Sequence, residues 1–263
     1  MNRLLMIAAL SLFPTLALAA KVPEVVRVCM EKNTPANSSA QTIELRARDR
    51  SGYEQVLHAD TYWKRFPDKQ SKILMHFNEP VDIRGARFLI IENKPQNDMY
   101  MYMPGLLKVR KITSKRISSS ILGTDFSYED YERLHGVFTD LRAEQYPDEV
   151  LDGRPVYVIN SYPEKDSGYE IIKTYIDIET CVSLKTELFE RGHQLRKTLT
   201  VAPGDIKKEG DIHVPRELLM RDLRDKTETR LLVKEIKTDV SLDDELFDPK
   251  QLKQKKAPLT QTD

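Results

Sequence analysis

Short runs in which apolar and polar residues alternate make up most of this sequence. In the first run, Ile43, Leu45 and Ala47 are separated by charged residues, which is the period-two pattern of a strand with one buried face. Clusters of Gly, Pro, Asn and Asp end the runs, and about eleven such runs follow one another. Strands joined by short turns pair in antiparallel order. We therefore predict a mainly β protein with a single antiparallel sheet, curved and open or rolled into an incomplete barrel.

Two segments break this pattern and are expected to be helical. Residues 22–32 place five apolar side chains on one helical face, and Asn-Thr-Pro follows. Ser127, followed three residues later by Asp130, resembles a helix cap, so residues 127–142 are expected to form one or two short helices interrupted near Gly136. After a first strand that starts at residue 40, the expected strands cover residues 53–66, 72–77, 86–91, 99–103, 106–112, 156–162, 169–178, 182–188, 193–201 and 229–240, with a further short one around Met220 and Leu223.

The first twenty residues have the composition of an export signal. Arg3 precedes an uncharged, Leu- and Ala-rich run over residues 4–18, and Ala-Leu-Ala then supplies the small residues that a signal peptidase reads. The run is shorter than the ~20 residues needed to cross a bilayer. We expect a signal peptide at residues 1–19, one domain at residues 20–249 and a polar tail at residues 250–263. The mature protein is expected in the periplasm of a Gram-negative bacterium.

Charge and composition exclude several kinds of function. Lys and Arg together number 41, as do Asp and Glu, so the bulk positive charge of a nucleic-acid binder is missing. Neither of the common Gly-rich phosphate loops occurs. The five histidines are scattered without the spacing of a zinc site, and no nucleophile motif is present. We expect no enzyme activity, no cofactor and no metal. The basic residues Lys108, Arg110, Lys111, Lys115 and Arg116 form either a solvated strand face or an anion site.

The chain has two cysteines, Cys29 and Cys181. In an oxidising compartment they are a natural disulfide pair. Two buried thiols remain the alternative, because sequence alone does not place the two Cα atoms within reach of each other.

Two expected strands are apolar on both faces, at residues 88–91 and 99–103. A sheet with one face in water alternates, so these strands need cover on both sides. Either helices provide the second cover or the strands line a cavity for an apolar ligand, and the flexible Met side chains suit such a wall. Trp63 is expected in the core or at the cavity rim. The candidates for the ligand wall are Phe88, Ile90, Met99, Met101, Tyr102, Met103 and Leu107.

Four sequence blocks in order resemble the outer-membrane lipoprotein-sorting proteins, the LolA-like family in its broad sense. The first is NEPVDIRGARFL, which resembles the pattern P-x-D-x-[KR]-G-x-x-[FL]-L. The second pairs MYMP with VRKI. The third, GTDFSYED, resembles G-[ST]-D-F-[ST]-x-E-D, and the fourth, DGRPVY, resembles G-R-P-x-Y. The blocks lie at residues 78–89, 101–112, 123–130 and 152–157, and the resemblance extends from about residue 29 to residue 247.

This resemblance implies an unclosed, half β-barrel covered by helices, with an apolar cavity that holds acyl chains in transit. It implies a periplasmic carrier that shuttles lipid or lipoprotein acyl chains between the inner and outer membranes. An inner-membrane exporter and an outer-membrane acceptor are the expected partners. The alternative is a periplasmic lipid-sensing regulatory module that binds a membrane signalling or exporter protein. Because the sequence ends soon after Phe247, the carrier is favoured.

The third block contains three acids that could suggest a metal or catalytic site. Ser127 and Asp130 fit a helix cap, and acids at a helix start favour its dipole. Asp125 before an aromatic residue fits a local turn. We expect Asp125, Glu129 and Asp130 to have structural roles.

Overall fold

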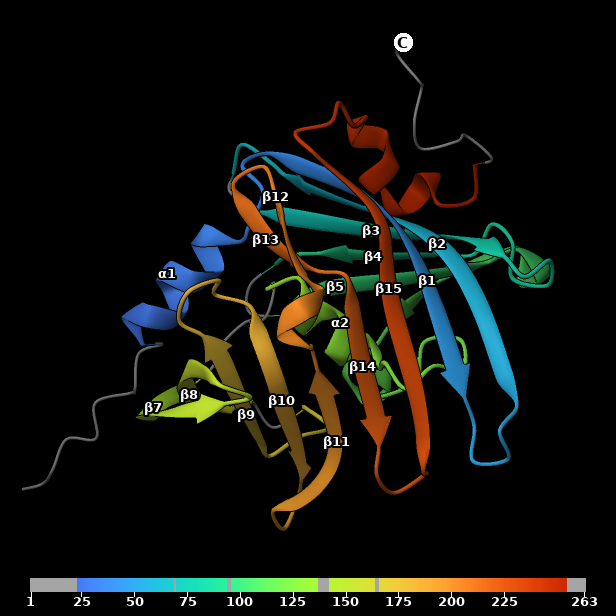
Figure 1. The fold of residues 1–263 in the computed structure, drawn as a ribbon. Helices are drawn as coiled ribbons and strands as arrows, with labels where there is room; N and C mark the ends of the chain where they lie inside the picture. Colours follow the sequence, from blue (N-terminus) through green and yellow to red (C-terminus); the bar gives the residue numbers. More distant parts are fainter. Residues whose placement is uncertain (1–22, 69, 94–95, 137–141, 164–165, 255–263) are drawn as a thin grey trace, which may run out of the picture.

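One large antiparallel sheet dominates the computed structural model (Figure 1), which describes residues 23–68, 70–93, 96–136, 142–163 and 166–254. The expected signal peptide lies outside these residues. Thirteen strands form the sheet in the order β6-β5-β4-β3-β2-β1-β15-β14-β11-β10-β9-β8-β7. Their bounds are β1 Ser38–Arg48, β2 Glu54–Arg65, β3 Ser71–Glu79, β4 Arg87–Ile91, β5 Asp98–Met103, β6 Lys108–Ile112, β7 Arg142–Leu151, β8 Arg154–Tyr162, β9 Ile171–Asp177, β10 Ser183–Glu190, β11 Gln194–Thr200, β14 Glu217–Asp222 and β15 Thr227–Thr238.

The sheet is two meanders joined at their first and last strands. β1 to β6 form the first meander, and β15 pairs with β1 to attach the second. β6 and β7 remain at opposite edges, so the curved sheet is not closed. The mainly β, half-barrel fold expected from the sequence is confirmed. The remaining two strands, β12 (Ile206–Glu209) and β13 (Ile212–Pro215), form a separate small sheet.

Two helices and five short 3-10 turns complete the part of the chain that the structure describes. The helices are α1 (Glu24–Lys32) and α2 (Tyr128–Leu134), which confirms helical structure in both segments where the sequence predicts it. Among the described residues, no helix is both long and apolar enough to cross a membrane. The 3-10 turns are η1 Pro104–Leu106, η2 Ser114–Arg116, η3 Pro203–Asp205, η4 Asp244–Phe247 and η5 Pro249–Gln251.

The sheet has a different cover on each face. The inner face, defined here as the one that contacts α2, holds the main core cluster, in which Phe88 packs against Tyr128 and Tyr131 of α2. On the outer face of β2 to β5, a second cluster is covered by Phe247 and Leu252 from η4 and the turn after η5. Figure 1 shows these C-terminal turns over one end of the first meander. Strands that are apolar on both sides are therefore sandwiched by protein.

Three parts of the fold differ from the expectation. The expected helical segment ended at residue 142 and no strand was expected over residues 143–151, but Arg142–Leu151 is an edge strand with mostly exposed residues, so its sequence lacks the alternation of a buried face. The β12–β13 hairpin was not expected. The polar tail expected at 250–263 begins as part of the outer cover, because Leu252 is buried; residues 255–263 lie outside the described chain.

Candidate functional site

A half-open cavity of about 420 Å³ lies on the inner face of the sheet, mainly between the second meander and α1. This volume lies within the range of ligand pockets, roughly 300 to 1,000 Å³. Its walls come from α1, the end of α2, β13 and eight strands of the large sheet, which are β1, β2, β8 to β11, β14 and β15, with the residues just beyond them. Figure 1 shows α1 beside the ends of β8 to β10 and α2 behind β14 and β15.

Most of the wall is aliphatic. Ile172, Leu188, Leu199, Met220 and Val233 line it from five strands, and all five are buried. These side chains project inward because residues two apart share a face of a strand. An apolar wall of branched side chains and one Met favours hydrocarbon over water. The cavity therefore has the chemistry of a site for an apolar chain.

Trp63 also lines the cavity and is only 5% exposed, which fits the sequence expectation of a core or cavity-rim position. It lies on β2, where it is paired with Ile73 of β3. Since it is the one Trp of the chain, its fluorescence reports on the cavity.

A disulfide holds α1 against the cavity. Cys29 and Cys181 are bonded, with their Cα atoms 4.9 Å apart, so the expected pair is confirmed and both residues line the wall. Val26 of α1 is buried against Ile159 and Ile176. Because α1 is only nine residues long, these tertiary contacts rather than helix propensity keep it in place.

Hydrogen bonds just after α1 add to this attachment. The side-chain amide of Asn33 donates to the carbonyl of Thr180 at 2.7 Å, and its Oδ1 accepts from the backbone N–H of His213 at 2.9 Å. Lys32 donates to the carbonyl of Glu179. Asn33 thereby joins α1, the β9–β10 connection and β13 at one end of the cavity.

The GTDFSYED block fixes α2 to the second meander. Ser127 and Asp130 form a reciprocal capping box at the start of the helix. Asp130 also accepts from Lys197 Nζ at 2.9 Å and from the Tyr169 hydroxyl at 2.8 Å, and all three side chains are buried. Lys197 donates to the carbonyl of Asp125 as well, at 2.7 Å. The block therefore supplies a charged anchor between α2 and β11.

Asp125 is bound to β15 in the same region. Its carboxylate accepts from the hydroxyls of Thr227 and Thr229, the latter at 2.6 Å, and its backbone N–H donates to Thr229 at 2.8 Å. Burial raises the pKa of Asp125 despite these two bonds. The carboxylate is fully engaged by neighbouring hydroxyls, which is a structural use.

The remaining acid of the block, Glu129, and the nearby Glu132 are paired too. Glu129 accepts from Arg133 at 2.8 Å, from the Gly168 N–H at 2.9 Å and from the Ser167 hydroxyl. Glu132 accepts from the side-chain amide of Asn97, and burial raises the pKa of Glu132 to about 7. The described residues contain no group of His, Cys, Asp and Glu side chains that could hold a metal.

The seven residues predicted for the ligand wall lie in the first meander, and none is among the described residues that line the cavity. Phe88, Ile90, Met99 and Met101 are buried on the inner face, in the cluster that contains Tyr128 and Tyr131 of α2. At Phe88, the rings of Tyr128 and Tyr131 pack directly against the sheet. A part for these four residues in cargo binding stays a prediction.

The other three candidates have different surroundings. Tyr102 faces the outer cluster beneath the C-terminal turns, and Met103 is half-buried beside the main core. Leu107 is 72% exposed in the turn before β6. The sequence analysis did not predict the cavity wall in the second meander. Thr174 and Thr186 lie in this wall among aliphatic residues. These hydroxyls, which face inward on paired strands, were the available signal.

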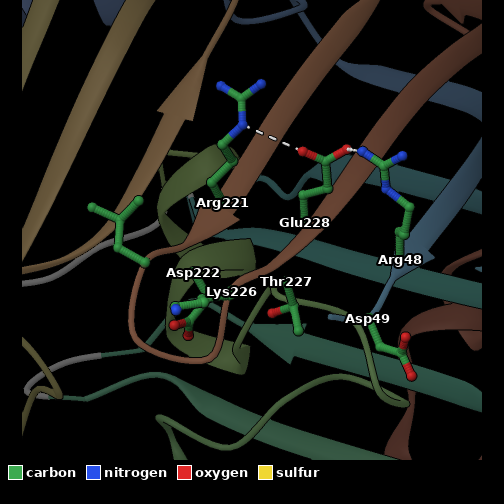
Figure 2. A pocket seen from close by; sticks show the side chains of 8 residues that line it. Arg48, Asp49, Arg221, Asp222, Lys226, Thr227 and Glu228 are labelled. Carbon is green, nitrogen blue, oxygen red and sulfur yellow. Dashed lines mark hydrogen bonds and ion pairs between the residues drawn. The ribbon is translucent and has the colours of Figure 1, made fainter. Parts of the chain in front are cut away.

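A second, shallower depression lies at the β14–β15 turn (Figure 2). Glu228 bridges Arg48 and Arg221 there, the latter at 3.3 Å, as the dashed lines in Figure 2 show. The depression is lined by charged side chains of both signs, three of which form this ion-pair bridge. It offers neither an apolar wall nor an unpaired charge cluster, so the cavity of the inner face is the candidate site.

Comparison with known families gives one match that covers most of the chain. A family model described as an uncharacterized protein, of the DUF1329 type, matches residues 69–254. No curated protein matches the sequence.

Solved structures with the same fold include proteins from three bacteria. A DUF1329 family protein from Desulfovibrio piger superposes with a TM-score of 0.81 at 22% identity, covering 87% of this chain and 96% of that one. A Vibrio parahaemolyticus domain, provisionally assigned as an outer membrane lipoprotein-sorting protein, gives 0.79 at 24% identity, covering 88% and 97%. A LolA superfamily protein from Nitrosomonas europaea gives 0.67 at 16% identity, covering 85% and 96%. At these identities the likeness concerns the fold.

Proposed function

This chain belongs to the DUF1329-like family whose model spans residues 69–254, and from that membership and the cavity we propose that it carries lipid or lipoprotein acyl chains. The observation that carries the proposal is the apolar cavity on the inner face, with α1 attached beside it by a disulfide. A relative from Vibrio parahaemolyticus is provisionally assigned as a lipoprotein-sorting protein, and another belongs to the LolA superfamily. Both share the half-barrel that forms this cavity.

Two features support the periplasm as the compartment of the proposed carrier. The sequence of residues 1–19 has the pattern of a cleaved export signal, followed by one domain at residues 20–249. The Cys29–Cys181 disulfide fits an oxidising compartment such as the periplasm. A carrier there moves acyl chains from an inner-membrane exporter to an outer-membrane acceptor.

The carrier binds and releases cargo without altering it. Burying one methylene group is worth about 0.8 kcal/mol, so a long chain held by a rigid site would leave too slowly. α1 and α2 are short helices beside the cavity, and their opening would expose it. Lipid incubated with the protein should be recovered unaltered, as mass spectrometry of extracted lipid would show. Accumulation of a hydrolysed product would contradict the carrier role.

Neighbouring residues on β10 provide a direct test of the cavity. Thr186 lines it, while Lys185 lies on the opposite face, with its ammonium 5.4 Å from the Tyr175 ring. Thr186→Phe should fill part of the cavity and weaken uptake of the apolar dye N-phenyl-1-naphthylamine by about tenfold. Lys185→Phe should leave uptake unchanged. Dye fluorescence and energy transfer from Trp63 measure both.

Native mass spectrometry of the protein purified from its own periplasm would identify the cargo. We expect a mass increment that disappears from the Thr186→Phe variant and persists in Lys185→Phe. Equal dye uptake by both folded variants and the unsubstituted protein would sink the proposal.

A further inference from the structure

The cavity contains few charged groups, and each is already paired. Asp130 and Arg133 are the charged side chains among the described residues that line it. Asp130 is bound to Lys197 at 2.9 Å, and Arg133 to Glu129 at 2.8 Å. Because the cations lie beside buried carboxylates, neither presents net positive charge to a ligand.

The surroundings of these pairs are unfavourable for an additional anion. Asp125 lies in the same network, since Lys197 donates to its carbonyl, and Glu132 neighbours Arg133 on α2. His135, which also lines the cavity, does not supply a counter-charge: burial lowers its pKa, and its Nδ1 donates to the Tyr131 carbonyl. A carboxylate or phosphate entering the cavity would lose its water without gaining an unpaired cation.

Neutral hydrogen-bonding groups are present in the same wall. Thr174 of β9 and Thr186 of β10 are register partners, and both line the cavity. Ser161 of β8 and Ser183 of β10 add hydroxyls, with the Ser183 and Thr186 hydroxyls 3.1 Å apart. Hydroxyls can both donate and accept, so together they suit an alcohol, ester or amide.

His213 adds one polar atom that has no partner. Its backbone N–H donates to Asn33, but its ring Nδ1 is buried and makes no hydrogen bond to any described residue. The residue lines the cavity at the end where Asn33 joins α1 to β13. A buried polar atom of this kind is satisfied by a ligand that offers a neutral hydrogen-bonding group.

We propose that the cargo enters this cavity by an uncharged polar head joined to an apolar chain, and that anionic amphiphiles are discriminated against. Ester- or amide-linked acyl chains belong to this class, whereas free fatty acids and phosphate-terminated lipids do not. The inference rests on the proposed carrier function and narrows its substrate class.

Two ligands with the same acyl chain test this selectivity. Displacement of N-phenyl-1-naphthylamine at pH 8 compares 1-monododecanoylglycerol with dodecanoate, whose carboxyl is then charged. We expect dodecanoate to bind at least about tenfold more weakly, the cost of burying an unpaired charge. Affinities within about threefold of each other would overturn the proposal while leaving the carrier function intact. Displacement by neither ligand would remove the carrier function and this inference together.

A charge placed in the wall gives a gain-of-function test. Thr174 is half-buried and faces the cavity, so Thr174→Lys adds a cation there without replacing a core residue. This variant should gain about tenfold in dodecanoate affinity relative to 1-monododecanoylglycerol, and the uncharged control Thr174→Val should not. The same selectivity in the Thr174→Lys variant as in the unsubstituted protein would contradict an electrostatic origin.

Discussion

Removal of the Cys29–Cys181 disulfide should destabilise the protein and loosen one wall of its cavity. The bond closes a loop of 152 residues. Chain-entropy arithmetic assigns such a loop about 5 kcal/mol at 25 °C, because the bond restricts the unfolded chain. For a domain of this size each kcal/mol shifts Tm by about 2–4 °C, so the Cys29→Ser/Cys181→Ser variant should melt about 10–20 °C lower.

Circular dichroism melts of the variant and the unsubstituted protein measure this difference. Both cysteines are replaced together so that no free thiol remains to form dimers. Dithiothreitol should lower the Tm of the unsubstituted protein toward that of the variant and leave the variant unaffected. A shift below about 2 °C would refute the reasoning, since it would mean that the unfolded chain gains little freedom when the bond is lost.

The variant also separates stability from cavity closure. Without the bond, α1 keeps the contacts of Val26 and the hydrogen bonds of Asn33. Below the melting range, faster amide exchange should therefore be confined to α1 and the start of β10, while β1 to β5 keep their protection. Hydrogen exchange followed by mass spectrometry checks this pattern. Equal acceleration throughout the sheet would show that the bond has no local effect on the cavity wall.

Four further substitutions test buried charge, exposed charge and backbone strain. Burial raises the pKa of Glu132 to about 7, above its ordinary value of 4.5. Its contribution to the free energy of unfolding is therefore full below pH 4.5 and is lost as pH rises through 7. In the unsubstituted protein, the free energy of unfolding should fall by about 3 kcal/mol between pH 4.5 and 8, as measured by urea titration. The Glu132→Gln variant should not show this fall. Lys197→Met should cost about 3–5 kcal/mol because it leaves Asp130 buried without its counter-ion, whereas Arg230→Met at the half-exposed Glu217 pair should cost under about 1 kcal/mol. Leu107 has a left-handed backbone, with φ of 49°, which glycine adopts without strain. Leu107→Gly should therefore stabilise the protein by about 1 kcal/mol, seen as a higher Tm.

The sequence predicts most of the strands because their inner faces are buried and their turns are explicit. β7 was not predicted because it has no buried face: as an edge strand it buries Ala143 alone. Pro147 within it also weakens the strand pattern. The disulfide was one of two alternatives, since the approach of Cys29 to Cys181 depends on how α1 packs on β8 and β9.

The position of the cavity could not be obtained from the same patterns. Burial by a helix and burial by a ligand select the same apolar residues, so the sequence does not distinguish these two surroundings for Phe88 and Met101. In the folded chain the aromatic rings of α2 fill the space beside Phe88. The position of α2 determines which part of the inner face stays open. The ion pair of Asp130 with Lys197, some seventy residues along the chain, anchors α2, and local sequence patterns do not reveal such a contact.

The pairing of β1 with β15 decides when the molecule can fold. Leu45 is opposite Leu231 in this pair, so the two meanders meet only after nearly the whole domain has been made. Pairing over such a distance closes a very long loop, and it slows folding relative to the hairpins on either side. Until β15 arrives, β1 and β14 each present an unpaired edge that can join to another chain. A nascent chain that stops short of residue 227 therefore holds two half-sheets with exposed edges, and its fate depends on a chaperone or a protease rather than on its own stability.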